Sequence, residues 1–74
     1  MPKRFKITAK FNNLWAVEQL TSKVNTDKRL SLEVKDNWTV YVYGDQNVKG
    51  LLDEAKEMVS SSYGYVDMVE TLGN

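Results

Sequence analysis

Two stretches of strand-forming residues, separated by a short turn signal, restrict the fold of this chain more than any other feature. In residues 30–35 every second side chain is apolar, and residues 38–43 are all β-branched or aromatic. Such residues favour β-strands, and the intervening Asp36-Asn37 pair is typical of a hairpin turn. The sequence therefore predicts an antiparallel hairpin over residues 30–43.

The rest of the pattern adds another strand and two helices. Residues 4–10 alternate between apolar and polar side chains, and this period of two indicates a half-buried strand. Residues 14–25 and residues 48–60 each carry apolar side chains at the spacing that lines one face of a helix. Residues 65–72 fit either a helix or an edge strand, because periodicity cannot decide so short a run.

These elements follow one another in the order β-α-β-β-α, with the last element left open. Residues 1–74 leave room for a single domain with one modest core. One-sided strands and amphipathic helices pack most economically as a two-layer α+β sandwich, an antiparallel sheet with two helices on one face. We expect the core to consist of the apolar residues between the two layers, namely Phe5, Ile7, Leu14, Val17, Leu20, Val24, Leu30, Leu32, Val34, Val40, Val42, Leu51, Leu52, Ala55 and Val59.

Four short segments share a pattern with a known family. They are residues 4–9, 21–24, 30–34 and 48–52, which read RFKITA, TSKV, LSLEV and VKGLL. Through them the chain resembles the histidine-containing phosphocarrier (HPr) family, which carries a phosphorylated His followed by Ala and Arg at the start of its first helix. This chain has no His, and its corresponding segment reads NNLWAV. The resemblance therefore implies the strand and helix order and not the phosphocarrier activity.

The absence of His and Cys excludes several kinds of functional site. The chain can form no catalytic thiol, imidazole base, zinc finger or disulfide. Its serines and threonines have no His to activate them. Asp53, Glu54 and Glu57 could hold a hard cation, but the same arrangement is typical of a solvated helix face, which we favour. We therefore expect no enzyme activity, no metal and no cofactor.

The formal net charge of zero results from two unequal halves. Residues 1–37 contain eight basic and four acidic side chains, whereas residues 38–74 contain two basic and six acidic ones. A neutral chain of this kind can still present a basic surface and an acidic surface.

The face of the sheet opposite the helices is the first candidate binding surface. If the first and third strands are neighbours, Lys6 and Lys10 lie beside Tyr41 and Tyr43, with Thr39 next to them. Tyr and Lys together fit a protein contact. They also fit nucleic-acid binding by base stacking and phosphate contacts. An ordinary solvent-exposed face, with Lys stems lying over the rings, would have the same composition.

The start of the first helix is the second candidate. Trp15 points away from the apolar stripe of its helix and, together with Phe11, could anchor a partner. Alternatively, a loop or the C-terminal segment could fold over Trp15, since residues 63–72 supply Tyr63, Tyr65, Val66 and Met68.

These features favour a small non-catalytic regulator or adaptor that binds another protein, and a homodimer is one form of such binding because small cores gain from association. A nucleic-acid-binding module is the alternative. The chain lacks the apolar runs of a secretory signal or a membrane helix. We therefore expect a cytoplasmic location and no membrane partner.

Overall fold

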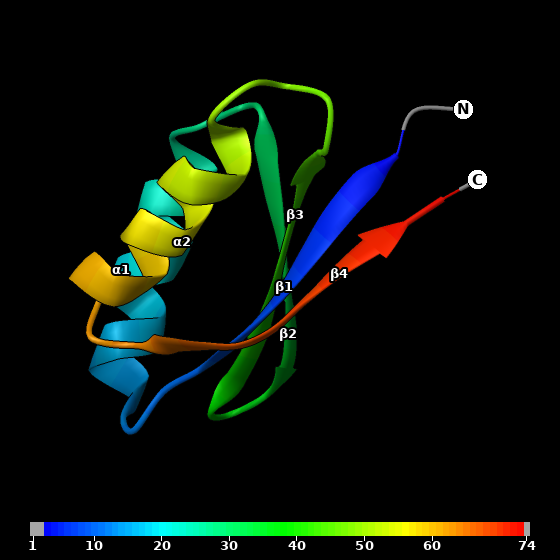
Figure 1. The fold of residues 1–74 in the computed structure, drawn as a ribbon. Coiled ribbons are helices and arrows are strands. Elements are labelled where there is room, and N and C mark those ends of the chain that lie inside the picture. The colour runs from blue at the N-terminus through cyan, green and yellow to red at the C-terminus, as the bar shows by residue number, and fades with distance from the viewer. Residues whose placement is uncertain (1–2, 74) are drawn as a thin grey trace.

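The computed structural model describes residues 3–73. They form β1 (Arg4–Lys10), α1 (Leu14–Asn25), β2 (Leu30–Asp36), β3 (Thr39–Asp45), α2 (Leu51–Ser61) and β4 (Tyr65–Leu72). The strands make one antiparallel sheet in the order β2-β3-β1-β4, and both helices lie on the same side of it (Figure 1). The prediction of an α+β chain with an antiparallel sheet and two helices is confirmed.

The helix boundaries follow from their first residues. α1 begins at Leu14, as predicted, because the Asn13 side chain accepts a hydrogen bond of 2.8 Å from the Ala16 backbone N–H and so caps the helix. α2 begins at Leu51, three residues later than predicted. Gly50 precedes it with φ +79°, a left-handed conformation that glycine adopts without strain and that does not continue a helix.

The segment left open by the sequence is a strand. Residues 65–72 form β4, which pairs antiparallel with β1 along the whole of β1. The hairpin differs from the prediction at its turn, since Trp38 belongs to the turn and β3 begins at Thr39, and at its end, since β3 continues to Asp45.

The core lies between the sheet and the helices. Phe5, Ile7, Leu20 and Leu51 are among its fully buried side chains. Leu32 and Leu52 pack against it but are only partly buried.

Two residues predicted in the core, Leu14 and Val34, are instead more than half exposed. Leu14 is the first residue of α1, and Val34 lies two residues from the end of β2. Both positions are near element ends, where the helix layer and the sheet no longer cover each other. Phe11 and Ala16, which were not predicted there, are buried in the core instead.

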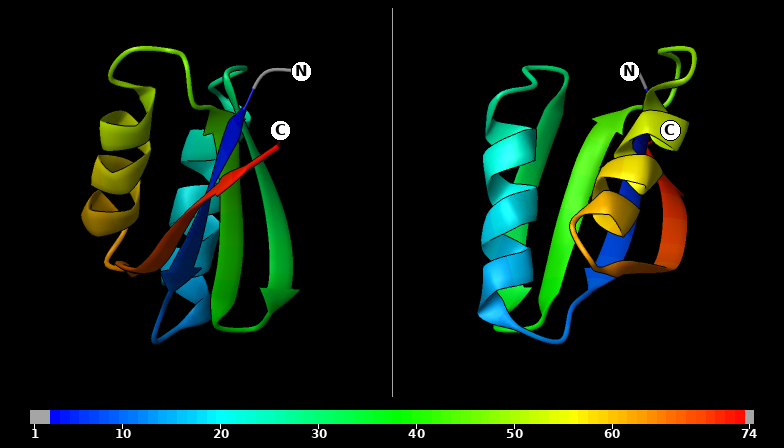
Figure 2. Two further views of the ribbon diagram at one scale, coloured as in Figure 1. Left: turned by 45° about the vertical axis from the view of Figure 1, so that its right-hand side comes forward. Right: turned by 90° about the vertical axis from the view of Figure 1, so that its left-hand side faces the viewer.

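One face of the sheet is left without a helix. The two views of Figure 2 show α1 and α2 side by side over one face, with nothing drawn over the other. This uncovered face (the open face) carries the side chains that alternate with the core residues of each strand.

Candidate functional site

The open face brings together the predicted lysines and tyrosines. β1 and β3 are neighbours, as expected, with Lys6 opposite Tyr43 and Lys10 opposite Thr39. Thr39 is buried, however, and Lys10 Nζ donates a hydrogen bond of 3.2 Å to its hydroxyl. Thr39 therefore positions Lys10 and does not itself present a surface to a partner.

The rings of Tyr41 and Tyr43 on this face each have a cation of the chain itself beside them. Lys6 Nζ lies 4.0 Å from the centre of the Tyr41 ring, and Arg4 Cζ lies 4.7 Å from that of Tyr43. The two rings meet edge to face with their centres 6.4 Å apart. Cation–π contacts of this kind stabilise both partners by about 0.5–1 kcal/mol at exposed sites. The rings are thus already partly occupied within the molecule.

Tyr43 is held further by an acidic neighbour. Its hydroxyl donates a hydrogen bond of 2.9 Å to Glu33 Oε1. Partial burial, followed by this contact with Glu33, raises the pKa of Tyr43 above its ordinary value. The phenol therefore stays protonated and acts as a donor at neutral pH.

A second surface lies at the end of the molecule where three connections meet. Phe11 N–H donates a 2.8 Å hydrogen bond to Trp38 O, which joins the β1–α1 connection to the hairpin turn. The rings of Trp15 and Tyr63 pack with their centres 5.5 Å apart, which joins the α2–β4 connection to the start of α1. In Figure 1 the β1–α1 connection and the hairpin turn lie at the lower end of the drawing.

This end exposes large apolar side chains. They are Leu14, Trp15, Val34, Trp38 and Tyr63, called here the aromatic end. Both tryptophans of the chain are among them. Trp15 is 54% exposed and Tyr63 is 70% exposed even though the two rings are in contact. Clustered exposed apolar groups are typical of interaction sites, whereas scattered ones are ordinary.

Phe11 does not belong to this surface, contrary to the prediction from sequence. It is 5% exposed. Its ring lies against the backbone of Gly64, where a Cβ atom would come within 2.8 Å of Phe11 Cζ. Because Gly64 has no side chain, the ring fits into the core. Trp15 remains 54% exposed, and within the segment 63–72 the Tyr63 ring packs against it and covers it only in part.

Sequence reasoning missed most of the aromatic end. Helical and strand periodicity placed Leu14 and Val34 in the core, and Trp38 was placed in a strand. One feature of the sequence indicates that Tyr63 lies in a connection and not in the core. It follows the serines at the end of α2 and precedes Gly64. Its φ of +66° is a left-handed conformation, which at a helix end is usually supplied by glycine.

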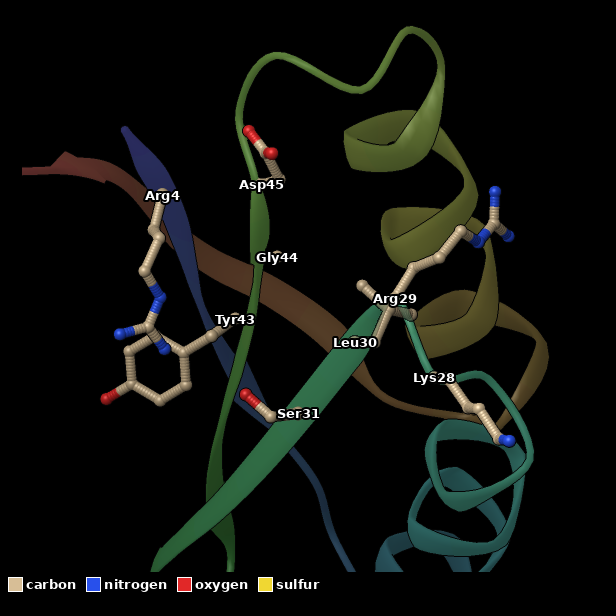
Figure 3. Close-up of a pocket in the computed structure, with 8 residues that line it drawn as sticks. All are labelled: Arg4, Lys28, Arg29, Leu30, Ser31, Tyr43, Gly44 and Asp45. Atoms are coloured by element: carbon tan, nitrogen blue, oxygen red, sulfur yellow. The ribbon is translucent and has the colours of Figure 1, made fainter. Parts of the chain in front are cut away.

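An open pocket of about 260 Å³ lies at the other end of the sheet. Its lining residues are Arg4, Lys28, Arg29, Leu30, Ser31, Tyr43, Gly44 and Asp45. Figure 3 shows Arg29 and Lys28 pointing away from Arg4. Arg29 is engaged by Asp27 and Glu54, each at 2.8 Å, and its hydrogen bonds lower the pKa of Asp27 to about 2. The cations of this pocket therefore do not converge on a common ligand position.

Comparison of the chain with protein-family models, with curated proteins and with solved structures found no match. The resemblance to the phosphocarrier family accordingly stays a prediction.

Residues 3–73 contain no group of three or more acidic side chains placed to hold a metal ion. Within the same residues, no helix has both the length and the apolar character required to span a membrane.

Proposed function

We propose that this protein is a small non-catalytic binding domain that regulates or recruits another protein through its aromatic end. The observation that carries the proposal is the exposure of five large apolar side chains, both tryptophans included, at the end of the molecule where three connections meet, with the Trp15 and Tyr63 rings in contact. Tryptophan and tyrosine dominate the energy of protein interfaces because each buries a large, rigid apolar area.

The backbone at Tyr63 supports this role. A non-glycine residue in the left-handed region costs about 1–2 kcal/mol. The Tyr63 side chain does not recover this free energy in the core, since it is 70% exposed. The left-handed residue closes the last turn of α2, where Tyr63 N–H donates to Ser60 O at 3.1 Å and Gly64 N–H donates to Val59 O at 3.0 Å, and it holds the exposed Tyr63 ring at the aromatic end.

Replacement of Trp15 by alanine is expected to weaken partner binding by at least about 30-fold, the loss that corresponds to an interface hot spot. The partner is first recovered on the immobilised protein from a lysate of the cells that make it, and its affinity is then measured with the purified pair. Val48→Ala is the matched control, because Val48 is also an exposed apolar residue but lies in the β3–α2 connection. Equal affinity for the wild type and Trp15→Ala would exclude the aromatic end.

Self-association is included in the same test. If the partner is a second copy of this chain, sedimentation of the wild type gives the mass of a dimer and that of Trp15→Ala gives the mass of a monomer. If the wild type sediments as a monomer, the partner is a different protein and not a second copy of this chain.

A second candidate function, nucleic-acid binding, is supported by the pairing of cations with aromatic rings on the open face. Arg4, Lys6 and Lys35 lie beside the rings of Tyr41 and Tyr43, although the basic and acidic side chains of the face are equal in number; the acidic ones are Glu33, Asp36, Asp45 and Glu70. Phosphates and stacked bases need this pairing of cations with aromatic rings. We rank this function second because Lys6 and Arg4 would have to move off the rings before a base could stack.

Binding of a fluorescent single-stranded RNA separates the two functions. Under this second proposal, affinity falls steeply between about 50 and 200 mM salt because phosphate contacts release counterions. Lys6→Ala and Tyr41→Ala both reduce it, whereas Lys49→Ala, in the β3–α2 connection, does not. The absence of binding at low salt would exclude a nucleic-acid partner.

A further inference from the structure

The strand β4 offers a regular free edge. It stands at one end of the sheet, with β1 as its neighbour. Its register with β1 is continuous from Met68, opposite Thr8, to Leu72, opposite Arg4, and shifts before Met68, where Asp67 is the extra residue. A strand at a sheet edge leaves alternate backbone N–H and C=O groups directed outward without a partner strand. Residues 68–72 therefore form an uninterrupted template for another strand.

The side chains of β4 are also only partly covered by the rest of the molecule. No residue of this strand is buried, whereas β1 buries Phe5, Ile7 and Ala9. Met68 is 51% exposed and Val69 is 37% exposed, although Val69 lies opposite the buried Ile7. Apolar area thus remains uncovered beside the free backbone edge.

The two edges of the sheet differ in their protection. At the opposite edge, Lys35 lies where the register of β2 shifts, and lysine is a residue that commonly prevents unwanted strand pairing. β4 contains no Lys, Arg or Pro, and its charged residues are Asp67 and Glu70. The charge of β4 is therefore purely acidic.

This charge argues against a second copy of β4 as the occupant. The antiparallel register that overlaps all eight residues of two β4 strands sets Asp67 of each copy opposite Glu70 of the other. Like charges placed directly across a strand pair are destabilising. A strand that brings basic side chains has the complementary charge.

The Glu70 carboxylate is accessible to a basic side chain of a partner strand. Its nearest cation, Lys6 Nζ, lies 4.0 Å away, and the Glu70 side chain is 43% exposed. An exposed ion pair at this distance contributes little. Glu70 shares the open face with Lys6, whereas Val69 shares the helix-covered side with Ile7. A partner strand would therefore alternate, with basic residues beside Glu70 and apolar residues beside Val69.

We propose that residues 68–72 of β4 bind an extended peptide strand in which basic and apolar residues alternate. The peptide adds a fifth strand to the sheet through backbone hydrogen bonds, and Glu70 selects its charge. This site does not use the aromatic end, so each of the two proposals can fail alone.

The test is a nuclear magnetic resonance titration of the whole ¹⁵N-labelled chain with a capped synthetic peptide of alternating Lys and Val, about seven residues long. We expect shift changes in the amides of β4 and its neighbour β1. Glu70→Lys should weaken binding at least about fivefold, since an attractive cross-strand pair becomes a repulsive one. Glu57→Lys, at an exposed acid on α2, is the matched control and should leave the affinity unchanged.

Two further peptides identify the mode of binding. The same peptide N-methylated at alternate residues cannot complete the strand hydrogen bonds and should not bind. A Glu and Val peptide should bind at least about fivefold more weakly than the Lys peptide. The proposal is overturned if either peptide binds as well as the first, if the shifts map away from β4, or if no shifts occur. It is also overturned if β4 shifts change with protein concentration alone, which would identify a second copy as the occupant.

Discussion

Replacement of Phe5 by alanine is expected to lower the free energy of unfolding by about 3–5 kcal/mol. The Phe5 ring is fully buried and lies across the strand pair from Gly44. Because Gly44 has no side chain to fill the space, the cavity left by the ring cannot collapse easily. Domains are stable by only about 0.05–0.15 kcal/mol per residue, so this loss is a large part of the total for 74 residues. Urea denaturation followed by circular dichroism measures it.

The same contact predicts a coupling between the two positions. A Cβ atom at Gly44 would lie 2.8 Å from Phe5 Cε2 and 2.9 Å from Leu30 Cδ2, so Gly44→Ala alone is expected to cost about 1–3 kcal/mol. In the Phe5→Leu background, which keeps the core apolar, the added methyl group has more room and costs less. Losses that simply add in the double variant would contradict the close approach of Phe5 to Gly44.

β1, β3 and the first helix could be predicted because each buries one face, and β2 could be predicted because its apolar and polar residues alternate. A slip of one residue would turn the apolar side of β1 or β2 to solvent, so the alternation in residues 4–10 and 30–35 determines which side chains face the core. The start of α1 follows from local capping by Asn13. β4 could not be predicted, because it is an edge strand without a buried side chain. Its pairing with β1 is a long-range contact that a local pattern does not contain.

The aromatic end was harder to predict because it depends on where the layers end. Leu14 and Val34 have the correct period for core residues, but periodicity does not indicate how far a helix or sheet layer extends. Phe11 and Trp15 looked alike in the sequence. Their different burial depends on Gly64 and Tyr63, which are distant in the chain.

The neutral net charge conceals neighbouring strands of opposite sign. β1 is basic on the open face, where Arg4, Lys6 and Lys10 alternate with the core residues. β4 beside it carries only acidic charges. The two strands therefore favour different ligands, and net charge alone could not have separated a polyanion from a basic peptide.

Phe11→Ala is expected to lower the free energy of unfolding by about 3–5 kcal/mol, whereas Trp15→Ala should change it by less than about 1 kcal/mol. Phe11 is 5% exposed and packs on Gly64, while the Trp15 ring is half exposed and contacts Tyr63. Urea denaturation of both variants, compared with their partner binding, separates a structural residue from a binding residue. Phe11 should affect binding only through unfolding, and Trp15 should affect binding while the fold is retained.

Gly64→Ala tests the cause of this difference. A methyl group there meets the Phe11 ring, so the variant should lose about 1–3 kcal/mol, and less of it in the Phe11→Leu background, where the smaller side chain gives room. If instead Phe11→Ala kept the wild-type stability and abolished partner binding, the ring would be part of the interface. Phe11 and Trp15 would then form one surface, and the burial of Phe11 against Gly64 would have to be released when the partner binds.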